Sequence, residues 1–154
     1  ETCKGYQRNM DAGRCPTLSG RNPLGMGTII VLERLLDSVI LIDHFNNIPQ
    51  ATDFLLALDP EKTAISVISY TEILTGLDEE GERKARPLLC IFEMLEIDAA
   101  VADKAATLRR KYGWKLPDAF QAAIAVIHDV KLCTRNTKDF NPQRHSFVEI
   151  PYLL

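Results

Sequence analysis

The sequence predicts an α/β protein: a three-layer α/β/α sandwich with a central, mainly parallel sheet. Two observations support this prediction. From Thr28 onward, short apolar segments of strand length alternate with longer segments of helical spacing, which is the pattern of consecutive strand–helix units. The first strand segment, with Ile29 to Leu32 and then Leu35 and Leu36, is also a nearly continuous apolar run, as parallel strands covered on both faces are.

Five segments are expected to form strands. They are a segment ending near Leu36 and the segments 63–66, 94–97, 131–134 and 147–150. Helices are expected at about 39–46 and 51–58, from 67 to near Gly76, from the acidic segment 78–82, from 98 to 113 and from 116 to 128. Periodicity alone makes the run Val39–Ile42 equally compatible with a strand.

Three residues mark the ends of expected helices. Asp98 stands where an N-cap residue accepts hydrogen bonds from the first turn. Gly113 follows the last turn, where glycine adopts the left-handed conformation that ends a helix. Pro117 falls in a first turn, where its missing N–H has no consequence.

Residues 1–27 are expected to form an irregular N-terminal extension, since glycine and proline interrupt any helical or strand period there. Residues 28–154 are expected to form one domain with its own core. The net charge of −3 argues against a protein that coats nucleic acid through bulk charge. No apolar run reaches the ~20 residues of a membrane span. We therefore expect no membrane partner. The four cysteines are scattered and have no metal-binding spacing, which is typical of a protein from a reducing compartment, so we expect a cytoplasmic protein.

Acidic and amide side chains follow several of the expected strands. They are Asp37, Glu72, Asp118, Asn136 and Asp139. Because the carboxyl ends of parallel strands share one edge of a sheet, these side chains are expected to meet there. Neighbouring carboxylates repel unless a cation joins them, and oxygen ligands without Cys or His favour Mg²⁺ or Mn²⁺. Taken alone, however, Asp37 is most simply a helix N-cap.

Four motifs occur in unbroken order within residues 28–154. They are Leu35-Leu36-Asp37-Ser38 with Ile42-Asp43, Ser66 with Glu72 and Gly76, Lys115-Leu116-Pro117-Asp118-Ala119, and Thr134-Arg135-Asn136-Thr137-Lys138-Asp139-Phe140. Together they resemble the motifs of PIN-domain ribonucleases, and most closely those of the VapC-type toxins of toxin–antitoxin pairs.

The resemblance implies a Mg²⁺-dependent endoribonuclease, with Mn²⁺ able to substitute. Asp37, Glu72 and Asp118 fall on the family's acidic positions and are expected to bind metal. The fourth position is Asn136, a neutral ligand that weakens or shifts a second cation, and Asp139 is a candidate substitute.

Other positions of the motifs have supporting roles by the same resemblance. Ser38 and Thr134 are expected to orient carboxylates or water. Asp43 matches a recurrent position, for which a structural role is favoured over metal contact because it lies nearly two helical turns beyond Asp37. Arg135 and Lys138 either bind RNA phosphates or are exposed charges.

The resemblance also implies an antitoxin partner and a homodimer. Trp114 and Tyr112 either stack on a base or, more simply for Trp114, pack in the fold. The three histidines, His44, His128 and His145, are expected at surface or capping positions, and no Ser–His–Asp arrangement is evident.

Two other functions compete with the nuclease. The first is a catalytically weak or inactive PIN-fold module that binds RNA or a protein partner, with Asn136 marking the decayed site. The second is a receiver-like phosphoacceptor domain. That fold also places an Asp at a strand end, but Asp118 at the start of a helix does not fit it.

Overall fold

A parallel sheet forms the centre of the computed structural model, which describes residues 31–154. Within this range five strands pair in the order β3-β2-β1-β4-β5, and every pairing is parallel. The strands are β1 (Arg34–Leu36), β2 (Thr63–Ser66), β3 (Glu93–Leu95), β4 (Lys131–Cys133) and β5 (Val148–Glu149). The predicted fold class is therefore confirmed. The predicted extension 1–27 lies outside the described residues.

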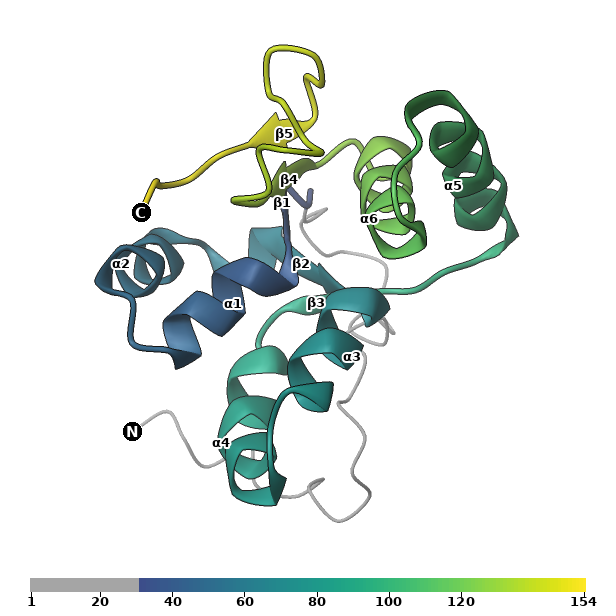
Figure 1. The fold of residues 1–154 in the computed structure, drawn as a ribbon. Helices are drawn as coiled ribbons and strands as arrows, with labels where there is room; N and C mark the ends of the chain where they lie inside the picture. The colour runs from purple at the N-terminus through teal and green to yellow at the C-terminus, as the bar shows by residue number, and fades with distance from the viewer. Residues whose placement is uncertain (1–30) are drawn as a thin grey trace, which may run out of the picture.

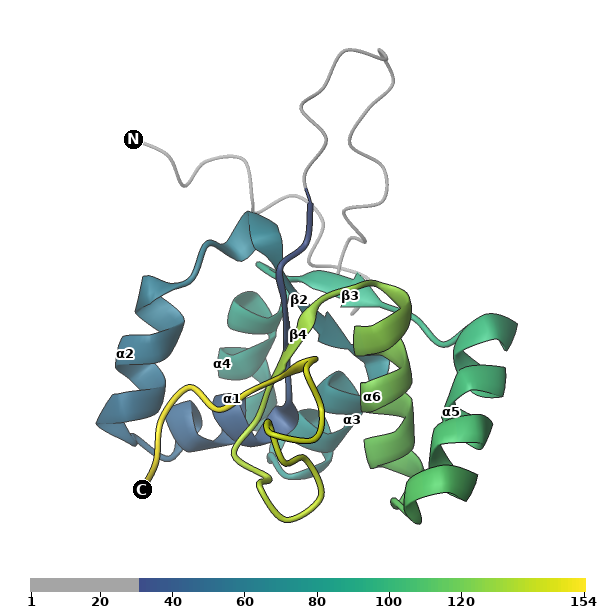
Figure 2. The same cartoon turned by 90° about the horizontal axis from the view of Figure 1, so that it is seen from above.

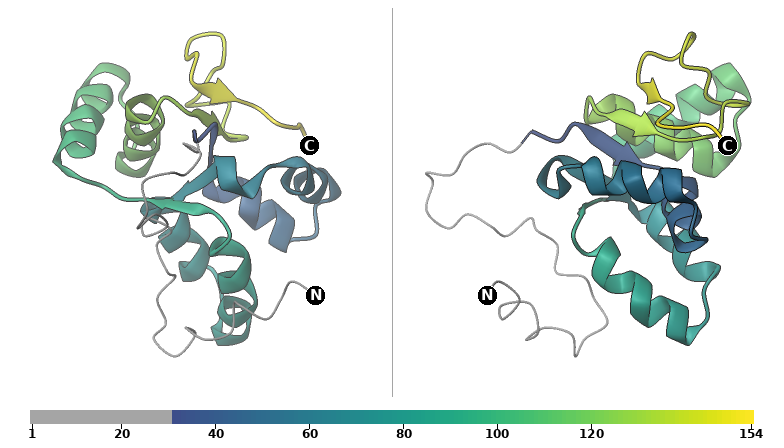
Figure 3. Two further views of the ribbon diagram at one scale, coloured as in Figure 1. Left: turned by 180° about the vertical axis from the view of Figure 1, so that it is seen from behind. Right: turned by 90° about the vertical axis from the view of Figure 1, so that its left-hand side faces the viewer.

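Helices cover both faces of the sheet (Figure 1). They are α1 (Ser38–Phe45), α2 (Pro49–Ala57), α3 (Val67–Thr75), α4 (Glu79–Leu89), α5 (Ala99–Tyr112) and α6 (Leu116–Ile127), with a short 3₁₀ turn, η3 (Pro60–Lys62), before β2. Seen from above, α5 and α6 lie on one side of the strands and α1 to α4 on the other (Figure 2). The view from behind shows the same separation (Figure 3).

Each face of the sheet has its own hydrophobic core, because alternate residues of a strand point to opposite faces. Leu35 contributes to the core beneath α5 and α6. Its neighbour Leu36 contributes to the core beneath α1, α3 and α4. Both side chains have no exposed surface, so these two residues of β1 are enclosed by the two helical layers, whereas Arg34 at the start of the strand is partly exposed.

The register of the central strands decides where the following residues emerge. The last residue of β1, Leu36, lies opposite Ile65 of β2 and Cys133 of β4. The polypeptide therefore leaves all three strands at one edge of the sheet, where the open α/β folds bind their ligands.

Most predicted element ends are confirmed. Asp98 accepts a hydrogen bond from the Val101 N–H at 2.9 Å, and Gly113 ends α5 with a φ of 71°. Pro117 lies in the first turn of α6. The run Val39–Ile42 is helical and belongs to α1, so its interpretation as a strand is wrong. The last strand is shorter than predicted and comprises only Val148–Glu149. No helix within residues 31–154 is long and apolar enough to cross a bilayer.

Two glycines at helix ends differ in backbone conformation and provide a matched pair of substitutions. Gly113 has a positive φ and open space around its missing Cβ, whereas Gly76 has a φ of −85° and ordinary contacts there. Gly113→Ala is expected to lower the free energy of unfolding by ~1 kcal/mol through backbone strain. Gly76→Ala is expected to leave it unchanged or raise it slightly. Urea denaturation compares the two, and equal losses would contradict this assignment of strain.

Candidate active site

The carboxyl edge of the sheet gathers the acidic residues that the sequence singled out. Asp37 directly follows β1, Glu72 lies in α3 after β2, and Asp118 lies in the first turn of α6. Asn136 and Asp139 belong to the loop after β4. The structure thus places all five predicted residues on segments that meet at this edge.

Electrostatics show that these carboxylates influence one another. Partial burial raises the pKa of Asp118, and so do the negative charges of three neighbouring carboxylates. In order of effect these are Asp139, Asp37 and Glu72, and the resulting pKa is about 6. Asp118 is therefore close enough to other negative charges to resist ionisation.

Asp37 stands at the N-cap position of α1, but its side chain makes no capping hydrogen bond. Its carboxylate is instead held by two donors at the sheet edge. The Thr134 hydroxyl donates to Oδ2 at 2.6 Å, and the Gln121 amide donates to Oδ1 at 3.4 Å. The interpretation of Asp37 as a simple capping residue is therefore wrong, and Thr134 contacts the carboxylate that it was expected to orient.

Gln121 is a site residue that sequence reasoning missed. It is buried at 3% exposure among the alanines of α6, one turn after Asp118. Its carbonyl accepts from the Ser66 hydroxyl at 2.7 Å, and its NH₂ group donates to Ser69 Oγ at 2.6 Å. The signal in the sequence was a single polar residue on an otherwise apolar helical face.

Hydrogen bonds fix which end of the Gln121 amide faces Asp37. The Ser69 hydroxyl donates to the Leu36 carbonyl at 3.1 Å, so Ser69 Oγ can only accept from the amide. The NH₂ end must therefore face Ser69, and the same end reaches Asp37. The Gln121 amide thus presents a donor, not an acceptor, to this carboxylate.

Glu72 and Ser38 form a second contact at the site. The Ser38 hydroxyl donates to Oε2 of Glu72 at 2.6 Å. Ser38 is buried, whereas Glu72 is exposed to solvent. The side chain immediately after Asp37 thereby orients the carboxylate that α3 contributes.

The loop after β4 is held in a compact turn by its own side chains. The Asn136 amide donates to Oδ2 of Asp139 at 2.9 Å, and the Asn136 N–H donates to Thr134 Oγ1 at 3.0 Å. Trp114 donates from its indole N–H to the Asp139 carbonyl at 3.0 Å. Asn136 and Asp139 therefore form one hydrogen-bonded polar pair in this loop.

Aromatic side chains pack beneath this loop. Trp114 is 5% exposed, stacks on Tyr112 at a centroid distance of 4.5 Å and meets Phe140 and His145 edge-on at 5.0 Å each. Trp114 is therefore a packing residue of the fold. His145 is 7% exposed within this cluster, so the expected surface position is wrong for it. Burial, then the charges of Arg144 and Lys111, lower the pKa of His145.

The other two histidines occupy positions of the expected kind. His128 is an exposed residue at the C-cap of α6, and His44 lies 2.9 Å from the Thr52 hydroxyl at the junction of α1 and α2.

The two basic residues considered as phosphate ligands, Arg135 and Lys138, lie in different surroundings. Arg135 is half-buried and forms an ion pair with Asp43 of α1. Lys138 is exposed in the turn between Asn136 and Asp139. Lys138 is consequently the more available of the two to a phosphate group.

The donor set at this edge consists of carboxylate, amide and hydroxyl oxygens, the ligands that hard divalent cations prefer. Within residues 31–154, no three Asp, Glu, His or Cys side chains converge closely enough to hold one ion by themselves. Mg²⁺ commonly binds through one or two carboxylates and keeps several waters. The crowded carboxylates of the site fit a hydrated cation of this type.

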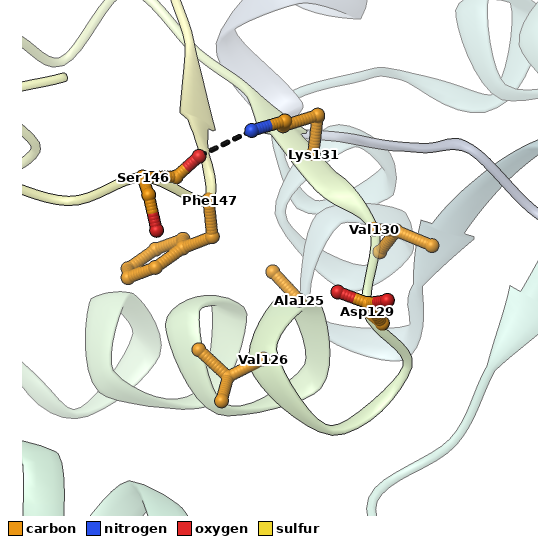
Figure 4. Close-up of a pocket in the computed structure, with 7 residues that line it drawn as sticks. All are labelled: Ala125, Val126, Asp129, Val130, Lys131, Ser146 and Phe147. Atoms are coloured by element: carbon orange, nitrogen blue, oxygen red, sulfur yellow. Dashed lines mark hydrogen bonds between the residues drawn. The ribbon is translucent and has the colours of Figure 1, made fainter.

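A separate hollow of about 210 Å³ lies at the opposite edge of the sheet (Figure 4). It is lined by the end of α6, the start of β4 and the residues Ser146 and Phe147. Lys131, the first residue of β4, reaches across it to the Ser146 carbonyl. None of the predicted site residues lines this hollow, so it is distinct from the carboxylate edge.

Replacing Asp118 tests the crowding of charge. Its folded-state pKa of about 6 exceeds the ordinary value, so the folded protein binds more protons than the unfolded chain between about pH 4 and 6. Stability that is present at pH 4 is therefore lost as the pH rises through this window. In metal-free protein, Asp118→Asn should raise the free energy of unfolding by ~1 kcal/mol at pH 8, after allowance for solvent screening, and by little at pH 4.

Urea denaturation in EDTA measures this difference, with the exposed Asp103 of α5 as control. Asp103→Asn should have no pH-dependent effect of this size. If Asp118→Asn raised the free energy of unfolding equally at pH 4 and pH 8, that result would contradict the electrostatic explanation.

Comparison with known proteins agrees with this architecture. The PIN domain family model matches residues 34–142. Ribonuclease VapC10 of Mycobacterium tuberculosis is 30% identical over 112 residues, which cover 69% of this chain and 84% of that protein.

Solved structures show the same fold. A chain of a toxin–antitoxin complex from Klebsiella pneumoniae is 36% identical, with a TM-score of 0.73, over 79% of this chain and 100% of that one. A chain of FitAcB from Neisseria gonorrhoeae has a TM-score of 0.65 at 24% identity, over 79% of this chain and 99% of that one, and so supports the fold alone. The chain belongs to the PIN-domain family, among its VapC-type members.

Proposed function

We propose that this protein is a Mg²⁺-dependent endoribonuclease and the toxin of a toxin–antitoxin pair. The observation that carries the proposal is the crowding of carboxylates around Asp118 at the carboxyl edge of the sheet. A relative with 30% identity is named as a ribonuclease, and a similar solved structure is a toxin–antitoxin complex. By analogy, we propose a cognate antitoxin and a homodimer for this chain.

Asp37 and Asp118 would hold the cation, with Glu72 binding it directly or through water, and Mn²⁺ would substitute for Mg²⁺. When bound, such a cation supplies a water of lowered pKa for attack on phosphorus and neutralises charge on the phosphate.

Neighbouring polar residues would orient the metal-binding carboxylates and attract the substrate. Thr134 and Gln121 hold the two oxygens of Asp37 in place, and Ser38 holds Glu72. Such orientation of metal-binding carboxylates by neighbouring donors commonly changes metal affinity or activity 10–100-fold. The exposed Lys138 would attract the RNA backbone at the mouth of the site.

Cleavage of total cellular RNA is the direct test of this function. Wild-type protein should cut RNA with Mg²⁺ and not with EDTA, and Asp118→Ala should reduce cleavage to the level seen with EDTA. Asp103→Ala, which removes an exposed carboxylate from α5, should leave cleavage unchanged. If wild type and Asp118→Ala cut alike, the cleavage does not come from this site, and a non-catalytic module that binds RNA or protein becomes the better account.

Asn136→Asp tests the fourth position of the site. The new carboxylate would face Asp139, because the present amide lies 2.9 Å from that side chain. We expect lower stability in EDTA, through repulsion, and about tenfold tighter Mn²⁺ binding, which corresponds to ~1.4 kcal/mol.

Isothermal titration calorimetry measures the affinity, with Asn141→Asp as the control. Asn141 accepts a hydrogen bond from the Gln143 N–H at 2.8 Å in the same connection, and a carboxylate can accept it equally well. Unchanged Mn²⁺ affinity in Asn136→Asp would place this position outside the metal site.

A further inference from the structure

Three polar side chains from distant parts of the chain meet beside the carboxylate site. Asp43 comes from α1, Arg135 from the loop after β4, and Tyr152 from the C-terminal segment that runs beside α2 (Figures 1 and 2). Arg135 donates from Nε to Oδ2 of Asp43 and from Nη2 to Oδ1, the second bond measuring 2.8 Å. The Tyr152 hydroxyl donates to Oδ2 at 2.9 Å.

This cluster keeps a buried carboxylate fully paired. Asp43 is 6% exposed, and an unpaired charge at such a position is strongly destabilising. Burial opposes its ionisation, but the hydrogen bonds from Arg135 and Tyr152 outweigh that effect and hold the pKa of Asp43 below its ordinary value. A planar guanidinium with two parallel bonds also fixes orientation, which a single point charge does not.

The position of Arg135 links the cluster to the site. It directly precedes Asn136, and the loop closes five residues later with a bond of 3.0 Å from the Phe140 N–H to the Asn136 carbonyl. The ion pair therefore attaches the beginning of this loop to α1, the helix that Asp37 precedes. The ring of Tyr152 also lies 6.3 Å from that of Phe54, which seats the C-terminal segment on α2.

We propose that Asp43 and Tyr152 are positioning residues, which through Arg135 hold the Asn136–Asp139 loop in its place at the carboxylate site. Arg135 then serves the loop rather than an RNA phosphate. The order of the loop is a property of the protein alone, whereas its effect on metal binding rests on the function proposed above.

Tyr152→Phe is the sharpest test, because it removes only the hydroxyl that bonds to Asp43. In metal-free protein, hydrogen–deuterium exchange of the amides 136–140 should become about tenfold faster, while exchange in α5 and α6 stays unchanged. Mn²⁺ affinity, measured by calorimetry on the folded protein, should fall about tenfold. Tyr70→Phe is the matched control, since the Tyr70 hydroxyl accepts from Arg86 in a contact outside this loop.

Arg135→Lys tests whether Arg135 positions the Asn136–Asp139 loop or only supplies a positive charge that attracts phosphate. Lysine keeps the positive charge but loses the two-point contact with Asp43. The proposal predicts that the loop amides exchange as fast as in Tyr152→Phe, and that Mn²⁺ affinity falls to a similar degree. If the loop amides of Arg135→Lys exchanged at the wild-type rate, the proposal would be overturned, because a positive charge alone would then be sufficient to order the loop.

Two further outcomes would overturn the proposal. One is unchanged loop exchange in Tyr152→Phe. The other is acceleration throughout the protein that Tyr70→Phe reproduces, which would show a general loss of stability. If wild-type protein neither binds Mn²⁺ nor cuts RNA, the proposed function fails, and the exchange of the loop amides still decides whether the cluster orders the loop.

Discussion

The enclosure of β1 between two parallel neighbours is the constraint on which the rest of this structure depends. Leu35 and Leu36 are buried in opposite cores, so the register of β1 against β2 and β4 cannot slip without exposing apolar surface. Because that register is fixed, the polypeptide leaves three strands at one level. The polar residues that follow are brought together by the packing of apolar ones.

This arrangement concentrates negative charge at a place where the fold itself does not neutralise it. The neighbouring groups that the structure supplies are mainly neutral donors, namely the hydroxyls of Ser38 and Thr134 and the amide of Gln121. Neutral donors orient carboxylates without cancelling their charge. Under the proposed function, this uncompensated charge is what attracts the cation, and it lowers the stability of the metal-free protein, a compromise that is common at functional sites.

The sequence predicted the strands, most helix ends and the gathering of acidic residues at the carboxyl ends of the strands, because each depends on local pattern or on strand order. Gln121, the Asp43–Arg135 pair and the buried His145 depend on contacts between segments that are far apart in the chain. A polar residue on an apolar helical face signals such a contact but does not identify the partner. The same limit explains why the sequence left Arg135 open between a phosphate ligand and an exposed charge, since its partner lies 92 positions earlier.

The indole of Trp114 gives the site a natural optical probe. It is the one tryptophan of the sequence, and it donates a hydrogen bond to the carbonyl of Asp139. Any rearrangement of that carbonyl changes the polarity around the indole, so the intrinsic fluorescence of the unlabelled protein reports on the loop. Loop movement can thus be followed in real time by stopped-flow mixing, without attaching a dye.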